Sequence, residues 1–159
     1  MEVNKLKILE ISPKIWVSTP TNNNVYKEKG INTFMRTPSH FFQISFDGAS
    51  KGNIGLAGYG GILRYAYSDP LHAYAFSCGF SSKNMAEFVA LEIGLHISMR
   101  EGFCLIQVHG DSKLVIQIFF KLLQGHTTYT LIHSWHLQEV VSNINVMLGN
   151  FDYVIPIHM

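Results

Sequence analysis

The sequence is poor in cysteine, in charged residues and in long apolar runs. Of its 159 residues only two are cysteines and 14% are charged, well below the roughly 25% charged residues of a typical soluble domain. Cys78 and Cys104 lie too far apart for a CxxC motif, which excludes a zinc ribbon and a disulfide framework. We interpret both as small buried residues of an intracellular protein in a reducing compartment, nuclear or cytoplasmic.

No apolar run approaches the roughly 20 residues of a transmembrane helix. Residues 1–5 contain an early acid and no apolar stretch, so we expect neither a secretory signal nor a membrane partner. With 47% hydrophobic residues and a formal charge of +1, the chain is typical neither of a disordered protein nor of a polybasic nucleic-acid binder. The glycines form no phosphate-binding GxxxxGK[ST] loop.

The net charge and the proline content of the chain both change near residue 41. Residues 1–41 contain six Lys and Arg against three acids, a net charge of +3, whereas residues 42–159 have a net charge of −2. The first part also contains most of the prolines and a run of polar residues. We therefore interpret residues 1–40 as a leader or linker, part of it disordered, and residues 41–159 as one domain.

The hydrophobic pattern of this domain predicts the element order β-β-β-α-β-α-α-β. Hairpin connections make the first three strands antiparallel, and helical crossovers make the later strands parallel to a neighbour. The prediction is an α/β fold with a mixed five-stranded sheet and helices on its faces. The expected strands are 41–46, 58–65, 72–79, 103–108 and 151–155, the last ended by Pro156. The expected helices lie between Ser81 or Ser82 and Gly102, between Ser112 and Gly125, and over 131–148.

Three acids occupy unusual positions in this pattern. Asp47 ends the first strand's apolar run and opens a glycine-rich turn, Asp111 lies between the fourth strand and a helix, and Glu87 lies in the first turns of an apolar helix. If the first and fourth strands are parallel neighbours, the three carboxylates meet at one sheet edge. Such a group repels itself unless a cation binds, and hard oxygen ligands favour Mg²⁺ or Mn²⁺.

Each acid also has a purely structural interpretation. Asp111 could simply occupy a helix N-terminus, where acids are favoured, and Asp47 could be a turn residue beside Gly48. The eight histidines are scattered. His133 and His136 share a helix face, but no carboxylate or cysteine at ligand spacing accompanies them, so they do not predict a zinc site.

Four ordered segments carry a family resemblance: FDGASKGN (46–53), GGILR (60–64), NMAE (84–87) and GDSKLV (110–115). On these segments, the chain from Phe42 onward resembles the ribonuclease H-like domains, specifically the reverse-transcriptase-like ribonuclease H group abundant in plants. The resemblance implies a ribonuclease H fold. It also implies a two-metal hydrolase, an endonuclease that cuts the RNA strand of an RNA–DNA hybrid.

The resemblance further implies roles for individual residues. Asp47, Glu87 and Asp111 fall on three of the family's four catalytic, metal-binding carboxylates, which hold two Mg²⁺ or Mn²⁺ ions. Asn53 and Asn84 match positions that contact the nucleic-acid backbone, although a turn former and a helix-start residue explain them equally well. The implied partner is an RNA–DNA hybrid or another nucleic acid.

The C-terminal part departs from the family pattern. The family's fourth acid follows the last strand in a terminal helix, which the sequence up to Met159 does not include. Asp152 lies at the wrong end of the last strand to replace it, whereas His158 lies near the strand end where some members keep a catalytic histidine. We therefore expect one metal position to be weak, leaving a single ion, and an uncovered sheet face open to a protein partner. The alternative functions are a catalytically dead module that binds nucleic acid or protein, and a truncated retroelement-derived fragment.

Overall fold

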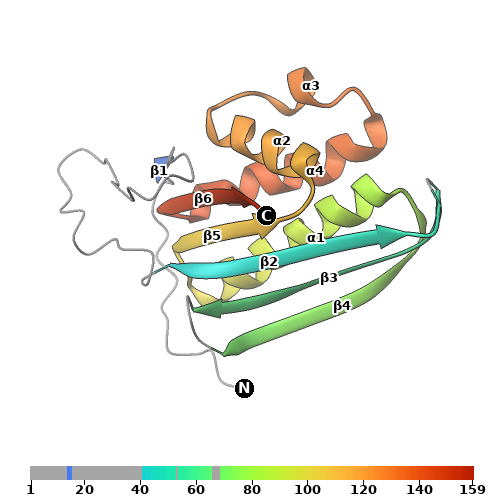
Figure 1. Cartoon of the computed structure of the whole chain (residues 1–159). Helices are drawn as coiled ribbons and strands as arrows, with labels where there is room; N and C mark the ends of the chain where they lie inside the picture. The colour runs from blue at the N-terminus through green and yellow to red at the C-terminus, as the bar shows by residue number, and fades with distance from the viewer. Residues whose placement is uncertain (1–13, 16–40, 53, 66–68) are drawn as a thin grey trace.

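A computed structural model of the chain describes residues 14–15, 41–52, 54–65 and 69–159. Almost all of the predicted leader and the candidate residue Asn53 therefore lie outside the described residues. Figure 1 shows the arrangement of the helices and strands. The strands are β1 (Lys14–Ile15), β2 (Phe42–Ser50), β3 (Gly55–Tyr65), β4 (Pro70–Ser81), β5 (Leu105–Gly110) and β6 (Tyr153–His158). The helices are α1 (Lys83–Glu101), α2 (Lys113–Leu123), α3 (Thr128–Leu131) and α4 (Trp135–Met147), followed by the short 3-10 helix η3 (Leu148–Asn150).

The strands form one sheet in the order β1-β6-β5-β2-β3-β4 (Figure 1). β2, β3 and β4 form an antiparallel meander, and β5 pairs with both β2 and β6 in parallel. The five predicted strands and their mixture of directions are confirmed. The two-residue β1, which lies within the predicted leader, pairs in parallel with β6 and adds a sixth strand.

Local capping signals fix the first two long helices. α1 begins after Ser82, whose hydroxyl accepts a hydrogen bond of 3.1 Å from the N–H of Met85, and ends at Gly102 with φ of +86°. α2 begins after Ser112, whose hydroxyl accepts a hydrogen bond of 3.3 Å from the N–H of Val115. Because hydroxyl N-caps and glycine C-caps are local sequence features, both helix starts and the end of α1 lie where the sequence predicts them.

The helix predicted over 131–148 is wrong at its N-terminal end. α3 ends at Leu131, Ile132 is extended with φ of −123° and ψ of 117°, and α4 begins only after Ser134. Ile132 is buried, and its carbonyl accepts a hydrogen bond of 3.0 Å from the side-chain amide of Gln138. The tertiary contacts of Ile132 therefore interrupt a segment whose apolar spacing alone is helical.

Four of the five predicted strands are longer than predicted, and in β2 and β6 the extension overturns a specific expectation. β2 continues to Ser50 in register with β3, so Asp47 lies within a strand rather than opening a turn. Pro156 lies inside β6 and does not end it. In the described residues β1 pairs with β6 only at Tyr153 and Val154, so Pro156 is paired on one side alone, where a residue without an N–H is tolerated.

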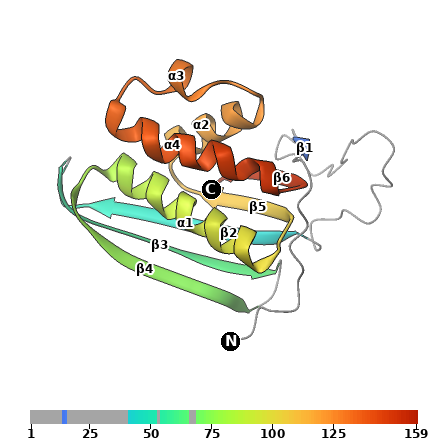
Figure 2. The same cartoon turned by 180° about the vertical axis from the view of Figure 1, so that it is seen from behind.

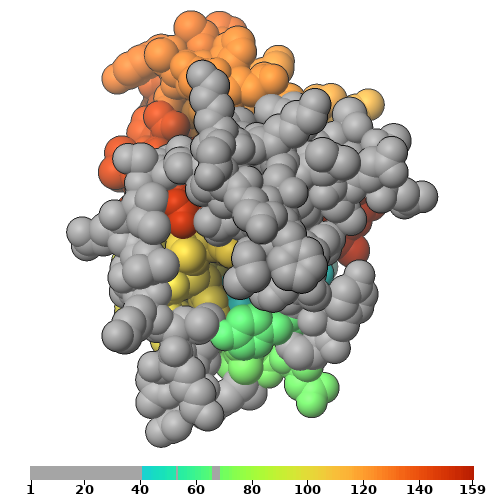
Figure 3. Space-filling model, turned by 90° about the vertical axis from the view of Figure 1, so that its left-hand side faces the viewer, coloured from blue at the N-terminus to red at the C-terminus, as the bar shows by residue number. Residues whose placement is uncertain are grey.

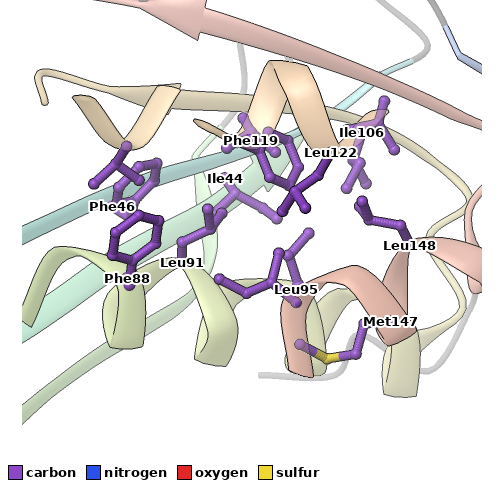
Figure 4. Close-up of a cluster of buried hydrophobic side chains, with 14 of the residues drawn as sticks. Ile44, Phe46, Phe88, Leu91, Leu95, Ile106, Phe119, Leu122, Met147 and Leu148 are labelled. Atoms are coloured by element: carbon purple, nitrogen blue, oxygen red, sulfur yellow. The ribbon is translucent and has the colours of Figure 1, made fainter. Parts of the chain in front are cut away.

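The described helices share one core on a single face of the sheet, with α1 and α4 in front when the molecule is seen from behind (Figure 2). Figure 3 shows the molecule from the side, with orange atoms of the α2 and α3 region at the top and green atoms of the β3 and β4 region near the bottom. Figure 4 shows side chains of β2 and β5 meeting those of α1 and α2. The fully buried residues of this core include Ile44, Leu91, Leu95, Ile106 and Phe119.

The reverse face of the sheet has a smaller buried cluster of Phe41, Tyr153 and Ile155. Cys78 and Cys104 are half-buried, rather than buried as predicted. Within the described ranges, no helix combines the length and the apolarity needed to cross a membrane.

Gly48 sets the close approach of α1 to β2. A Cβ at this position would lie 2.4 Å from the backbone nitrogen of Glu87 and 2.5 Å from the carbonyl carbon of Ala86. Gly48→Ala therefore forces α1 away from the sheet, and we expect it to lower the free energy of unfolding by about 2 kcal/mol. Urea denaturation measures this loss. Gly149→Ala is the control, because a Cβ there meets nothing within 4 Å; equal effects of the two variants would contradict the prediction.

Candidate metal centre

The site begins where two neighbouring strands separate. β2 pairs with β5 only as far as Ser45 and His109. Beyond this point β2 continues along β3 to Ser50, whereas β5 ends at Gly110 and the chain turns into α2. The two parallel strands therefore leave a fork at this edge of the sheet.

Three carboxylates meet in this fork. Asp47 comes from β2, Asp111 from the turn after β5, and Glu87 from the first turns of α1. One ligand oxygen of each lies within 4.8 Å of the others. Asp47 and Asp111 are exposed at the rim, whereas Glu87 is fully buried. The convergence predicted from the sequence is therefore present, with one buried carboxylate below two that face solvent.

Glycines allow these elements to come so close. Because Gly48 has no side chain, the backbone of α1 can approach β2 beside Asp47, as described above. Gly110 does the same beside Asp111, because a Cβ there would lie 2.4 Å from the ring of Phe46. The two aspartates that the fork brings together are thus each adjacent to a glycine that a larger residue could not replace without displacing a neighbour.

The environment of Glu87 raises its pKa from 4.5 to about 7. Burial is the largest cause, followed by the negative charges of Asp111 and Asp47, while Lys83 and the N–H of Gly48 act in the opposite direction. Neither carboxylate oxygen has a hydrogen bond of normal geometry. A buried charge without a partner is costly, and a cation shared with both aspartates would remove that cost. The three residues therefore fit a divalent metal ion.

No other acid among the described residues joins this group. Asp152 is buried, and its N–H donates a hydrogen bond of 2.7 Å to the carbonyl of Cys104 beside the start of β5. From there β6 runs along the sheet to His158 at the fork, a distance of about 20 Å at roughly 3.3 Å per residue. As predicted, Asp152 lies at the wrong end of the last strand to act as a fourth ligand.

The end of β6 contacts the backbone of the turn at the fork through two hydrogen bonds that the sequence did not reveal. His158 Nε2 lies 2.9 Å from the carbonyl oxygen of Asp111, and because a carbonyl only accepts, this ring nitrogen carries the hydrogen. The N–H of Met159 donates a hydrogen bond of 2.9 Å to the carbonyl of Gly110. His158 therefore contacts the turn that positions Asp111 rather than its carboxylate.

Only one of the two asparagines predicted to bind nucleic acid lies within the described residues. Asn84 is exposed in the first turn of α1, three residues before Glu87 and thus on the metal-site end of the helix. Asn53 lies outside the described residues. Contact of either residue with a nucleic acid stays a prediction.

A hollow of about 610 Å³ opens beside Asp47 and Asp111. Its lining includes the small residues Ser45, Gly60 and Ala75, which alternation along their strands places on the sheet face away from the helices. The hollow shares its rim with the three carboxylates, so a bound molecule could reach both.

Residues 45–159 match the model of the reverse transcriptase-like family. The chain belongs to this family. Together with the sheet topology, the match confirms the ribonuclease H-like fold that the four sequence segments indicated. A search of curated protein sequences gave no match.

Solved structures with a similar fold include three ribonucleases H. RNase H1 from the halophilic archaeon Halobacterium salinarum is 26% identical, with a TM-score of 0.63 over 74% of this chain and 84% of that one. The N-terminal RNase H domain of a Mycobacterium tuberculosis protein, fused to maltose binding protein, is 25% identical, with a TM-score of 0.66 over 74% and 86%. LC11-RNase H1 in complex with an RNA/DNA hybrid is 23% identical, with a TM-score of 0.61 over 74% and 84%, and shows the fold alone.

The raised pKa of Glu87 makes the stability of the metal-free protein depend on pH. The folded state holds the proton more tightly than the unfolded state, so this stabilisation is complete below pH 4.5 and is lost as the pH rises through 7. We expect the free energy of unfolding in a chelator to fall by about 2 kcal/mol between about pH 5 and pH 8. Chemical denaturation at several pH values measures it.

Glu87→Gln should remove most of this pH dependence, because the amide does not titrate and needs no cation. Glu139→Gln is the matched control, since Glu139 is exposed on α4. An unchanged dependence on pH in Glu87→Gln would assign the effect to other groups.

Proposed function

We propose that the chain is a divalent-metal-dependent endonuclease of the ribonuclease H type that cuts the RNA strand of an RNA–DNA hybrid. The observation that carries this proposal is the group of Asp47, Glu87 and Asp111, whose oxygens lie within 4.8 Å of one another in a ribonuclease H-like fold. Two structures of similar fold support the substrate class: LC11-RNase H1 and the foamy viral protease-reverse transcriptase are each solved with an RNA/DNA hybrid.

Asp47, Glu87 and Asp111 would hold Mg²⁺ or Mn²⁺. A bound ion of this kind supplies an activated water and stabilises the leaving oxygen of a phosphodiester. Glu87 contributes from below, and its burial keeps its carboxylate away from bulk water and from competing hydrogen bonds. Asp47 and Asp111 face solvent, so a phosphate can approach the remaining coordination positions. Because the described residues provide three carboxylates, we propose that one ion binds more tightly than a second.

Positive charge beside the acids favours a nucleic-acid backbone. Lys83 and Lys113 are the exposed first residues of α1 and α2, and both helix N-termini also attract phosphate. The net charge of −2 over residues 42–159 already includes these two lysines, so the positive charge is a local feature beside the acids. Asn84, and Asn53 in the loop after β2, would donate hydrogen bonds to the backbone. Recognition through backbone and 2′-hydroxyl groups reads duplex shape rather than sequence.

Metal binding is the first testable consequence. At about pH 8, Mg²⁺ or Mn²⁺ should raise the melting temperature of the full chain by mass action, and the increase should be smaller at about pH 5.5, because protons compete for Glu87. Differential scanning calorimetry with each metal alone measures the shift. Glu87→Gln should lose it and Glu139→Gln should keep it; a shift of equal size in both variants would place the ion elsewhere.

Cleavage is the second testable consequence. The full chain with Mg²⁺ should cut the labelled RNA strand of a hybrid and leave the DNA strand intact, and a chelator should stop the reaction. Asp47→Asn should lower kcat at least about 100-fold, because it removes a metal ligand. Asp69→Asn, an exposed position at the start of β4, is the control. Cleavage that survives in Asp47→Asn would point to a contaminating nuclease.

The second candidate function is a binding module without catalysis. It is favoured by the presence of three rather than four carboxylates in the described cluster and by the net negative charge of the domain. Fluorescence anisotropy with the same hybrid at low and high salt separates the two, because phosphate contacts weaken steeply with salt. Salt-sensitive binding without cleavage would replace the nuclease by a binding module. Absence of both would reject nucleic acid as the partner.

A further inference from the structure

The outer edge of β4 has no partner strand in the part of the chain that the structure describes. β4 is the last strand of the sheet, and β3 occupies its other side from Pro70 to Ser81 (Figure 1). Backbone N–H and C=O groups along such an edge can pair with another strand. Proteins usually prevent this pairing with charged side chains, prolines or bulges.

The middle of this edge carries little of that protection. Residues 70–82 contain no Asp, Glu, Lys or Arg. Pro70 and a register shift occupy one end, and a second register shift beside Gly79, with φ of +66°, occupies the other. Between these irregular ends, residues 72–77 pair with β3 in unbroken register. The residues of this regular part are uncharged apart from His72, whose Nε2 lies 3.5 Å from the carboxylate of Glu101 at the end of α1.

The side chains of this regular part are arranged by face. On the reverse face of the sheet, Ala73, Ala75 and Ser77 are small and exposed. On the helical face, Phe76 is 56% exposed, with its ring centroid 5.7 Å from that of Tyr59. A second copy of the strand, antiparallel and related by a twofold axis perpendicular to the sheet, would place small residues beside small residues on one face. On the other face, Phe76 would pack beside the aromatic residues of the second copy.

We infer that β4 is a self-association edge that joins two copies of the chain into one continuous sheet. Backbone chemistry requires a strand as the occupant, and charge favours a second copy. The edge has no cation to attract a nucleic acid, and the twofold pairing brings no Asp, Glu, Lys or Arg of β4 against its counterpart.

The size of the contact predicts its strength. Six residues a side with one half-exposed phenylalanine bury less than about 1,000 Å² in total, below the roughly 1,200–2,000 Å² of stable complexes. The dimer is therefore weak and depends on concentration. It leaves the three carboxylates accessible, because β3 separates β2 from β4 and Asp47 lies about 10 Å from the edge at roughly 4.8 Å per strand.

Sedimentation equilibrium of the full chain over a wide concentration range tests this inference. A reducing agent is present, so that the half-buried Cys78 of β4 cannot cross-link two copies. We expect a reversible monomer–dimer equilibrium, and amide hydrogen exchange in residues 72–77 that slows as the concentration rises. Ala75→Lys places like charges close together, because the exposed Ala75 lies near the middle of residues 72–77 and therefore beside the twofold axis, and it should raise the dimer Kd about tenfold or more. Gln124→Lys adds the same charge at the end of α2 and should leave the Kd unchanged.

Phe76→Ser is a second variant that weakens the contact without adding charge, and it decides the matter if Ala75→Lys does not fold by circular dichroism. A chain that stays monomeric at every concentration overturns the inference. Oligomers larger than two also overturn it, as does a dimer that tolerates the β4 variants as well as it tolerates Gln124→Lys. A monomer that instead binds an unrelated strand peptide at β4 shows that the edge pairs with another partner and likewise rejects self-association.

Discussion

The unpaired negative charge of Glu87 is the constraint on which the candidate site depends. Its carboxylate is fully buried, lacks hydrogen bonds of normal geometry and lies beside two more carboxylates. The packing of α1 holds it there, because Leu91 and Leu95 on the same helix are anchored in the core. Hydrophobic packing thus holds the carboxylate in a buried position, where its ionisation is costly. A bound cation would remove that cost, so the packing raises the affinity of the site for a cation.

The fork between β2 and β5 brings Asp47 and Asp111 close to Glu87. A continuous ladder between β2 and β5 would fill the space beside Asp47 with backbone, but pairing stops at Ser45 and His109. The separation of two parallel strands therefore creates the room, and the turn after β5 supplies the second aspartate. The hollow on the reverse face opens at the same point. Sheet geometry, rather than a dedicated loop, brings together the carboxylates and the accessible surface beside them.

Local signals made much of this arrangement predictable. Ser82, Ser112 and Gly102 mark helix ends through contacts with their own neighbours, so the sequence locates them without knowledge of the fold. The meeting of Asp47 with Asp111 follows from one topological rule, because parallel neighbouring strands end at the same edge. The four segments that resemble the ribonuclease H-like domains independently pointed to the same residues.

Features that depend on distant contacts were not predictable. The extension of β2 past Asp47 requires its pairing with Tyr59 and earlier residues of β3. The break at Ile132 requires burial of that side chain and a hydrogen bond from another helix. The contact of His158 with the backbone of Asp111 depends on where β6 ends relative to β5. For β2 and His158 the deciding partner lies far away in the sequence, and for Ile132 it is burial in the core; periodicity and propensity carry no information on either.

The two edges of the sheet are chemically unlike, and Pro156 is the reason. The half of β6 beyond the reach of β1 contains a residue that cannot donate to an incoming strand. An incoming strand along this half of β6 would leave one of its own carbonyl groups without a donor, so strand addition is weaker here than along the regular part of β4. A single imino acid thus gives the sheet one edge that accepts a strand more readily than the other.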